Sequence, residues 1–290
     1  MRIDANRRVA LVTGASSGIG KSTVIKLVEL GWQVIGVGRD PQRSAAAEAE
    51  IAAAARDDGF TMVRADFTLM ADVKRVADEA GSRTGRLDVL INNAGGVRDR
   101  QVITAEGTEA TFAANHLAPF LLTRKLMPLL KASAAGQPPG TTRVIAVSSS
   151  AHRVIEGLNW DDLQSLGDFH ASLAYCRAKL ANILFTRELA RRADPDEIVA
   201  QAMHPGVVAS NFASHGDAAM QAHMAAAPTV SPDEPAETLA WLATDPEGGR
   251  NSGRYFYRKV EETPSEAAQD HAAATRLWAE SEALLAKLGF

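Results

Sequence analysis

A glycine-rich turn between a strand and a helix is the feature that most constrains the fold of this chain. The apolar run at residues 9–12 is followed by Gly14, Gly18 and Gly20, and a helical pattern of apolar residues begins at Lys21. Glycines in this position let the backbone turn tightly and approach a pyrophosphate, whose charge the amides of the helix N-terminus meet. The pattern predicts a dinucleotide-binding α/β fold, and a glycine-rich turn without a ligand is the structural alternative.

Gly20 and the two residues after it, Lys21 and Ser22, also match the end of a P-loop. A P-loop requires a further glycine five positions before its last glycine. The chain has Ala15 there, so the P-loop interpretation fails by one residue. The Gly-x-x-x-Gly-x-Gly spacing remains as a variant of the dinucleotide turn.

Apolar runs and helical patterns alternate along the rest of the chain. The runs at residues 34–38, 60–65, 87–91, 143–148 and 198–203 are typical of buried strands. Hydrophobic residues at 46% and charged residues at 23% fit a globular protein with a substantial core. We expect a doubly wound parallel sheet, a Rossmann fold of about seven strands with helices on both faces, formed by residues 1–290 as a single domain.

Charge and cysteine content exclude several classes of function. A net charge of −4 and a pI near 6.0 argue against nucleic acid as a partner. The single cysteine, Cys176, cannot form an internal disulfide, and no cysteine-histidine cluster predicts a metal site. The first residues lack the apolar core of a signal peptide, and no apolar run is long enough for a membrane span. We therefore expect a cytoplasmic protein.

The residue after the second predicted strand indicates which dinucleotide is bound. Arg39 stands where an acidic residue would bond the ribose hydroxyls of NAD. A guanidinium instead offers planar, charged donors to a 2′-phosphate, which favours NADP over NAD. A solvated arginine at a strand end is the alternative, and the neighbouring Asp40 weakens the NADP assignment.

Polar and small residues follow the third and fourth predicted strands. Asp66 is expected either to accept a hydrogen bond from an adenine amino group or to cap the next helix. Asn92 and Asn93 precede Ala94 and Gly95, and small residues at the end of a central strand leave room for a ligand. Asparagines that merely satisfy the turn backbone are the alternative.

Tyr175 and Lys179 are four positions apart on a predicted helix and therefore share one of its faces. A nearby ammonium favours the phenolate, so Lys179 is expected to lower the pKa of Tyr175. Such a phenol can exchange a proton with a substrate oxygen. An exposed surface pair is the structural alternative.

Four motifs together resemble the short-chain dehydrogenase/reductase family over nearly the whole chain. They are residues 13–20, residues 92–95, Tyr175-x-x-x-Lys179 and His204-Pro205-Gly206. A narrower resemblance is to the retinol-dehydrogenase-like branch. It rests on residues 115–123, 148–152, 179–185 and 252–256, and on the 26 positions between Ser149 and Tyr175.

The resemblance implies roles for four catalytic residues. Tyr175 would exchange the proton, and Ser149 would hydrogen-bond the substrate oxygen. Lys179 would lower the phenol pKa and bind the nicotinamide ribose. Asn115 would hold a water that links the lysine to solvent, although an asparagine that bonds a neighbouring carbonyl is the alternative. Because three serines are adjacent, Ser148 and Ser150 remain alternatives for the substrate-binding serine.

The resemblance also implies a set of cofactor-binding residues. These are Gly14, Ser16, Ser17, Gly18, Ile19, Gly20, Arg39, Asp66, Phe67, Asn93, Ala94, Gly95, Tyr175, Lys179, Pro205, Gly206, Val207 and Ser210. Backbone groups near Val207 would bind the nicotinamide carboxamide. His204 resembles a catalytic base by residue type, but its place in the motif indicates a structural role.

Three further segments are assigned by resemblance or by pattern. Residues 153–172 are expected to fold over the site as part of its wall, and residues 211–233 are expected to form a substrate lid whose apolar lining suits a lipophilic carbonyl. Residues 265–288 are expected to form an amphipathic helix that packs on the rest of the domain. The apolar residues of the Tyr175 helix belong to the core or to a subunit interface, which leaves a homo-oligomer open.

These features lead to an NADP-dependent oxidoreductase that acts on a small-molecule carbonyl or alcohol. Two alternatives use the same fold. One is an NADP-binding sensor or partner protein without turnover, and the other is an NADP-using epimerase or dehydratase, which would show no net redox change.

Overall fold

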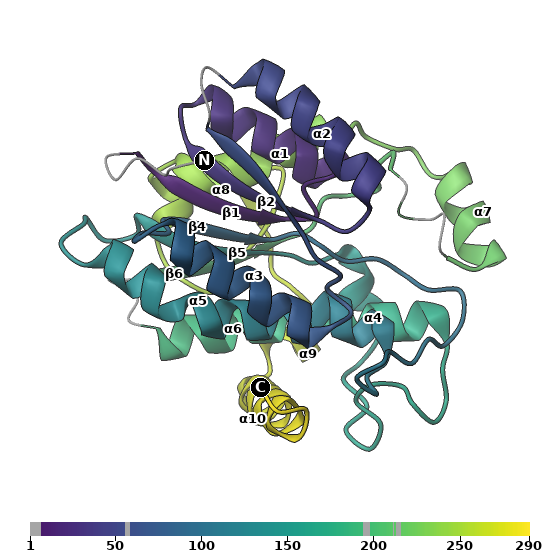
Figure 1. Ribbon diagram of the computed structural model, residues 1–290. Helices are drawn as coiled ribbons and strands as arrows, with labels where there is room; N and C mark the ends of the chain where they lie inside the picture. Colours follow the sequence, from purple (N-terminus) through teal and green to yellow (C-terminus); the bar gives the residue numbers. More distant parts are fainter. Residues whose placement is uncertain (1–6, 56–58, 194–197, 211, 213–215) are drawn as a thin grey trace.

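A mostly parallel sheet forms the centre of the molecule, with helices on both faces (Figure 1). The computed structural model describes residues 7–55, 59–193, 198–210, 212 and 216–290. The strand order is β3-β2-β1-β4-β5-β6-β7-β8. The strands are β1 Val9–Thr13, β2 Gln33–Gly38, β3 Phe60–Arg64, β4 Val89–Asn92, β5 Thr142–Val147, β6 Ile198–Met203, β7 Tyr255–Tyr257 and β8 Val260–Glu261. The predicted doubly wound fold is confirmed.

The eighth strand is short and antiparallel, and the sequence carried little signal for it. β8 pairs with β7 through a hairpin whose turn residues are Arg258 and Lys259. Both residues have positive φ angles, 49° and 65°. Hairpin turns of this kind usually contain asparagine or glycine, so a turn of two basic residues gives no recognisable pattern.

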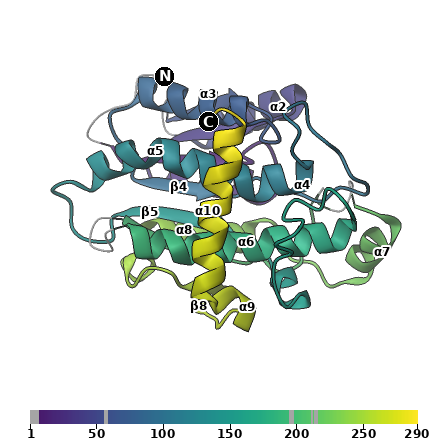
Figure 2. The same cartoon turned by 90° about the horizontal axis from the view of Figure 1, so that it is seen from below.

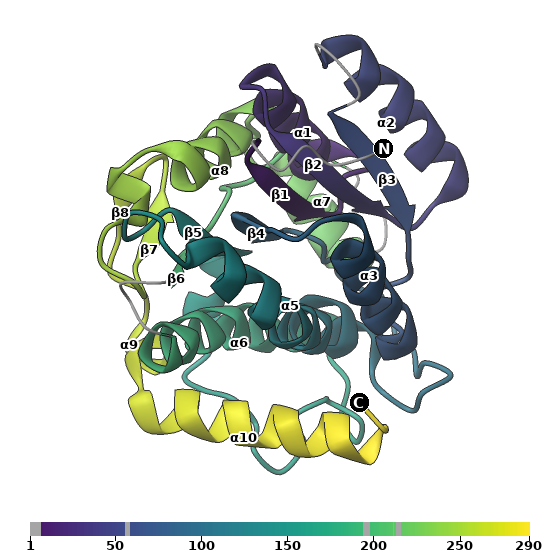
Figure 3. The same ribbon diagram turned by 60° about the vertical axis from the view of Figure 1, so that its left-hand side comes forward.

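The helices divide between the two faces of the sheet. α1 Gly18–Glu29, α2 Pro41–Ala54 and α8 Asp233–Thr244 cover one face, and α3 Met70–Arg83, α5 Ala118–Ala134 and α6 Ala171–Arg192 cover the other (Figure 3). Because the central parallel strands are buried on both sides, their sequences are largely apolar. In β4, for example, Leu90 packs into one core cluster and Ile91 into the other.

The sequence predicts one long helix from about residue 106 to residue 130, but the helix that starts at residue 110 is divided by a π-helical turn. α4 Ala110–Phe112 leads into η1 Ala113–Leu117, and α5 follows. Pro119, near the start of α5, has no N–H to bond the carbonyl four residues earlier, which is that of Asn115. The π turn, which holds one extra residue, occurs where that helical hydrogen bond is missing.

The C-terminal segment crosses the outer face of α5 and α6 (Figure 2). It forms two helices, α9 Glu266–Gln269 and α10 His271–Lys287, because the Asp270 side chain caps α10 by accepting from the amides of residues 272 and 273. Ser281 of α10 hydrogen-bonds His116 of the π turn at 2.8 Å, in the interior. Burial lowers the pKa of His116 to about 3, so this ring stays neutral.

Two other segments complete the described chain. α7 Ala218–Ala226 lies in the segment expected as a lid, whose residues 211 and 213–215 are outside the described part. The short helices η2 Ser150–Val154 and η4 Glu247–Gly249 lie in loops. Among the described residues, no helix combines the length and apolarity that crossing a membrane would need.

Candidate active site

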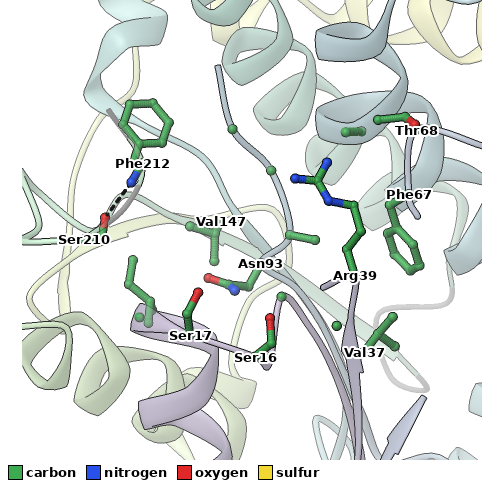
Figure 4. Close-up of a pocket in the computed structure, with 18 of the residues that line it drawn as sticks. Ser16, Ser17, Val37, Arg39, Phe67, Thr68, Asn93, Val147, Ser210 and Phe212 are labelled. Carbon is green, nitrogen blue, oxygen red and sulfur yellow. Dashed lines mark hydrogen bonds between the residues drawn. The ribbon is translucent and has the colours of Figure 1, made fainter. Parts of the chain in front are cut away.

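A pocket is formed by residues that follow the carboxyl ends of the parallel strands (Figure 4). Arg39 and Phe67 lie at one end of this pocket, and Ser210 and Phe212 lie at the other, with Asn93 between them. The predicted residues that line it are Gly14, Ser16, Ser17, Gly18, Ile19, Arg39, Asp66, Phe67, Asn93, Ala94, Gly95, Tyr175, Lys179, Pro205 and Ser210. Residues from six separate loops or helices are therefore brought together, as expected at the carboxyl edge of such a sheet.

Five other predicted residues are not part of the pocket lining. They are Gly20, Asn115, Ser149, Gly206 and Val207. Gly206 has a φ of +76°, and a Cβ there would lie 3.4 Å from the Tyr257 ring. This glycine lets the chain turn closely past the tyrosine.

The glycine turn is held against the loop that follows β4. The Thr13 hydroxyl accepts hydrogen bonds from the amides of Asn93 (3.0 Å) and Ala94 (2.8 Å). The Asn93 side chain donates to the Thr13 carbonyl at 2.9 Å. A Cβ on Gly20 would overlap the Gly14 carbonyl and the Asn93 amide. The turn thus requires glycine at this position because two backbones meet there.

Gly20→Ala is expected to lower the free energy of unfolding by about 2 kcal/mol or more, because the added methyl forces two backbones apart. It should also weaken dinucleotide binding by more than about tenfold. Thermal unfolding and NADPH fluorescence titration measure the two effects. The matched control is Gly81→Ala, an open position on α3, where alanine should stabilise the helix by about 1 kcal/mol. Equal unfolding free energies and equal NADPH affinities of the two variants would contradict the requirement for glycine at position 20.

Asp40, the residue that weakened the NADP assignment, caps the N-terminus of α2. Its carboxylate accepts from the Arg43 amide at 2.8 Å, and this hydrogen bond is the main cause that lowers its pKa. The Arg43 guanidinium lies 3.7 Å from the same carboxylate. The negative charge beside Arg39 is therefore partly balanced by the helix terminus and by Arg43.

Asp66 does not cap α3, so that alternative is wrong. Its Oδ1 accepts from the amide and the hydroxyl of Thr68, at 3.0 and 2.9 Å. The N-cap of α3 is Leu69, and the first amides of the helix donate to the carboxylate of Glu106, which comes from a distant loop. Asp66 remains at the pocket surface, beside Phe67.

Tyr175 and Lys179 share a buried face of α6, as predicted, and both line the pocket. The Lys179 ammonium lies 5.5 Å from the centre of the phenol ring and donates to the Val147 carbonyl at 3.1 Å. The exposed-pair alternative is therefore wrong. The two side chains stand where the loop after β5 meets α6.

The expected acidification of the phenol by Lys179 is not what the structure shows. Burial raises the pKa of Tyr175 well above its ordinary value, and a side-chain hydrogen bond with Ser149 opposes that shift. Because the ammonium faces the ring and bonds the Val147 carbonyl, it does not offset the burial. The Tyr175 hydroxyl stays protonated at neutral pH.

The three adjacent serines have different surroundings. The Ser148 hydroxyl is buried and donates to the Lys179 carbonyl at 2.7 Å. Ser150 is exposed at the start of η2. Ser149 is half-buried, and its side chain acts to lower the pKa of the Tyr175 phenol against the larger effect of burial. Of the three serines, Ser149 is the one whose side chain acts on the phenol.

The side chain of Asn115 is fully used by its neighbours. Its Nδ2 donates to the carbonyls of Gly96 and Thr111, both at 2.8 Å, and its Oδ1 accepts from the Gly96 amide at 3.1 Å. The alternative of an asparagine that bonds neighbouring carbonyls is thus confirmed. Its own backbone carbonyl lacks the usual α-helical donor, because Pro119 has no N–H.

His204 is packed as a structural residue rather than a base in the pocket. Its ring stacks on Tyr257 with 4.2 Å between ring centres, and its Nδ1 accepts from the Gly206 amide at 3.3 Å. Its Nε2 lies 3.4 Å from a carboxylate oxygen of Glu262. These contacts fit the structural role that the motif indicated.

The insertion at residues 153–172 does not form the pocket wall as expected. Trp160 lies under the guanidinium of Arg276 on α10, 4.5 Å from its ring centre. The Gln101 side chain donates to the carbonyls of Ser165 and Leu166. The described lining contains no residue of this insertion, because its apolar side chains pack on α6 and α10 instead.

Two lining residues had no signal in the sequence. Arg98 reaches the pocket from the loop after β4, and the pKa of this guanidinium is lowered first by burial and then by the charge of Arg39. Phe212 packs its ring 5.0 Å from that of Tyr175, and its amide donates to the Ser210 hydroxyl at 3.4 Å (Figure 4). Neither residue belongs to a motif with a fixed spacing.

Comparisons with known proteins agree with this geometry. A family model described as short chain dehydrogenase matches residues 8–221. Retinol dehydrogenase 14 of Mus musculus is 36% identical over 96% of this chain and 86% of its own length. Polyprenol dehydrogenase of Homo sapiens is 34% identical over 94% of this chain and 84% of its own length.

Solved structures show the same fold. A crystal structure of an uncharacterized protein from Mycobacterium Paratuberculosis is 31% identical, with a TM-score of 0.73 over 98% of this chain and 95% of its own. The RhlG/NADP complex of Pseudomonas aeruginosa is 28% identical, with a TM-score of 0.68 over 86% and 93%. A 3-ketoacyl-(acyl-carrier-protein) reductase from Brucella melitensis, complexed with NADH, is 25% identical, with a TM-score of 0.67 over 86% and 95%. One neighbour thus holds NADP and another NADH.

Proposed function

Because this chain belongs to the short-chain dehydrogenase/reductase family and resembles its retinol dehydrogenases, we propose that it reduces a lipophilic carbonyl with NADPH, or oxidises the corresponding alcohol. Members of this family are oxidoreductases that act on CH–OH or C=O groups with a nicotinamide cofactor. The preference for NADP and the lipophilic substrate are the parts that need support from this chain.

The observation that carries the proposal is that Tyr175 and Lys179, with Ser149 acting on the phenol, belong to the same pocket as Arg39. The residues present suit a dinucleotide. The glycine turn is so closely packed that a Cβ at Gly20 would overlap the Gly14 carbonyl. This turn leads into helix α1, whose first amides can meet a pyrophosphate. A non-catalytic sensor would need the turn but not the buried phenol and ammonium.

When bound, the nicotinamide supplies the hydride, and the protein supplies placement and protons. Tyr175, kept protonated by burial, gives its proton to the developing alkoxide as general acid. Ser149 donates a hydrogen bond to the same oxygen. Lys179 places a positive charge on the same buried face of α6, where it would bind the nicotinamide ribose. The carbonyl of Asn115 would hold the water that returns a proton.

Apolar residues near the phenol support a lipophilic substrate. Phe212 covers the Tyr175 ring, and the α7 segment beyond it consists mainly of alanine and methionine. The relatives are named for retinol and polyprenol, both of which are long apolar alcohols. The substrate panel should therefore include aldehydes and ketones of increasing chain length.

Arg39→Ala is expected to weaken NADPH binding by about 10- to 100-fold, because a charged hydrogen bond to the 2′-phosphate is lost. NADH carries no such phosphate, so its affinity should change little. Fluorescence titration of both dinucleotides measures the difference without any substrate. Arg64→Ala, at an exposed position of β3 outside the lining, is the matched control. Equal losses for NADPH and NADH would show that Arg39 does not select the phosphate.

The proposed activity is tested with a panel of carbonyl and alcohol compounds, monitored at the nicotinamide absorbance with NADPH and with NADH. NADPH-dependent reduction of at least one compound is the expected result. Tight NADPH binding with no turnover of any compound would favour a sensor. Product formation without net change in the nicotinamide would favour an epimerase or dehydratase.

A further inference from the structure

The backbone of Ser149 is held by a buried histidine that lies outside the pocket. The Ser149 carbonyl accepts from Nδ1 of His152 at 2.7 Å, and the His152 amide approaches the same carbonyl at 3.3 Å. The Ser149 hydroxyl in turn accepts from the Ala151 amide at 3.2 Å. Ser149 is extended, with φ −158° and ψ 152°. The direction of the Ser149 carbonyl therefore fixes the ψ angle of this residue. The ψ angle in turn fixes the position of the serine hydroxyl relative to Tyr175.

The two partners of the ring determine its tautomer. A carbonyl can only accept, so Nδ1 of His152 carries the proton that is donated to Ser149. The amide of Ser265 donates to Nε2 at 3.2 Å, so Nε2 has no proton. His152 is therefore a neutral ring that connects the serine loop to the C-terminal segment, 113 residues further along the chain.

The surroundings of His152 keep the ring neutral and in place. The side chain is 0% exposed, and its ring meets that of Tyr255 edge-on, with 5.2 Å between centres. Burial is the main cause that lowers the pKa of His152, and the charges of Arg153 and His204 lower it further. The hydrogen bond to Ser149 and the charge of Glu262 act in the opposite direction without outweighing the burial. Glu262 also pairs with Arg153 at 3.5 Å and with His204 at 3.4 Å.

We propose that His152 is a positioning residue for the reaction, which holds the Ser149 peptide between Tyr175 and the start of α9 so that the serine hydroxyl meets the substrate oxygen. This inference rests on the proposed role of Ser149. His152 is not among the residues that line the pocket. Its action is to restrict the serine loop, and a misplacement of about 1 Å in a reacting group can cost on the order of a hundredfold in rate.

The test compares two variants of the histidine with a neighbouring control. His152→Phe keeps a ring against Tyr255 but removes the donor, and we expect kcat to fall about 10- to 100-fold with little change in KM for NADPH. His152→Asn returns a donor near the position of Nδ1, and it should recover most of kcat. Tyr255→Phe removes a buried hydroxyl that has no hydrogen-bond partner among the described residues, so kcat should stay at the wild-type level.

Each outcome bears on the proposal. Wild-type kcat in His152→Phe, or equal losses in the Phe and Asn variants when both are folded by circular dichroism, would overturn it. Imidazole ¹⁵N chemical shifts give a readout that needs no substrate, with His152 assigned by the signal lost in His152→Phe. A neutral ring protonated on Nδ1 is expected, and a proton on Nε2 overturns the proposal. If the wild-type protein reduces no compound, the proposed function fails, and the tautomer alone decides whether the serine loop is held as described.

Discussion

Replacing Tyr175 with phenylalanine is expected to lower kcat for carbonyl reduction by about a thousandfold, the size of effect that loss of a general acid produces. The substitution removes one oxygen from a buried ring and leaves its contact with Phe212 in place. Binding of NADPH should persist, because in the proposed function the phosphates would meet the glycine turn and Arg39 rather than the phenol. Steady-state kinetics and NADPH fluorescence titration measure the two quantities separately.

The matched control is again Tyr255→Phe, since Tyr255 is also deeply buried and its pKa is also raised by burial. That variant loses the same atom outside the pocket. If both variants kept wild-type turnover, the proton would have to come from another group. If Tyr175→Phe also lost NADPH binding, the phenol would be a binding residue, and its role as an acid would be unsupported.

The raised pKa of Tyr175 also gives the direction of the pH dependence. Because the phenol stays protonated through neutral pH, the acid needed for reduction is present without any titration. Oxidation of an alcohol needs the phenolate, and its rate should rise with pH across the alkaline range. The two directions of the reaction should therefore have different pH profiles.

The fold was predictable because its signals are local and repeat along the chain. Each buried strand appears as an apolar run, and β6 begins and ends at the predicted residues. The Tyr175-Lys179 pair depends only on helical spacing, so its shared face followed directly from the sequence. The order of the strands brings the separate motifs to one edge, which is why residues so far apart in the chain line one pocket.

The features that were missed depend on contacts between distant segments. Glu106 bonds the first amides of α3, and no local pattern predicts a cap that comes from another loop. Arg98 and Phe212 reach the pocket from loops without regular spacing. The charge balance at Tyr175 was also misjudged, because the sequence shows that Lys179 is near but not that its ammonium faces the ring and bonds Val147.

Lys179→Met should abolish most activity and at the same time stabilise the protein. The loss of the ammonium that would hold the nicotinamide ribose in place should lower kcat by about a hundredfold or more. Burial lowers the pKa of Lys179 from 10.5 to about 8. Below pH 8 the folded protein therefore keeps this positive charge buried, whereas the same charge is hydrated in the unfolded chain. Removing that charge should raise the free energy of unfolding at pH 7 by about 1–3 kcal/mol. Part of the gain is lost with the hydrogen bond to Val147, although Asn182 also reaches that carbonyl, at 3.4 Å.

The sign of the pH dependence follows from the two pKa values. Between about pH 8 and 10.5 the unfolded chain binds more protons at this lysine than the folded protein does, so the stability of the wild-type protein rises with pH in that window. Thermal unfolding at several pH values should therefore show that Lys179→Met has a higher free energy of unfolding than the wild type at pH 7. This difference should become smaller above pH 8. Lys125→Met, on the exposed side of α5, should show no such convergence. A Lys179→Met protein less stable than the wild type at pH 7 would mean that the buried ammonium contributes to folding as well as to catalysis.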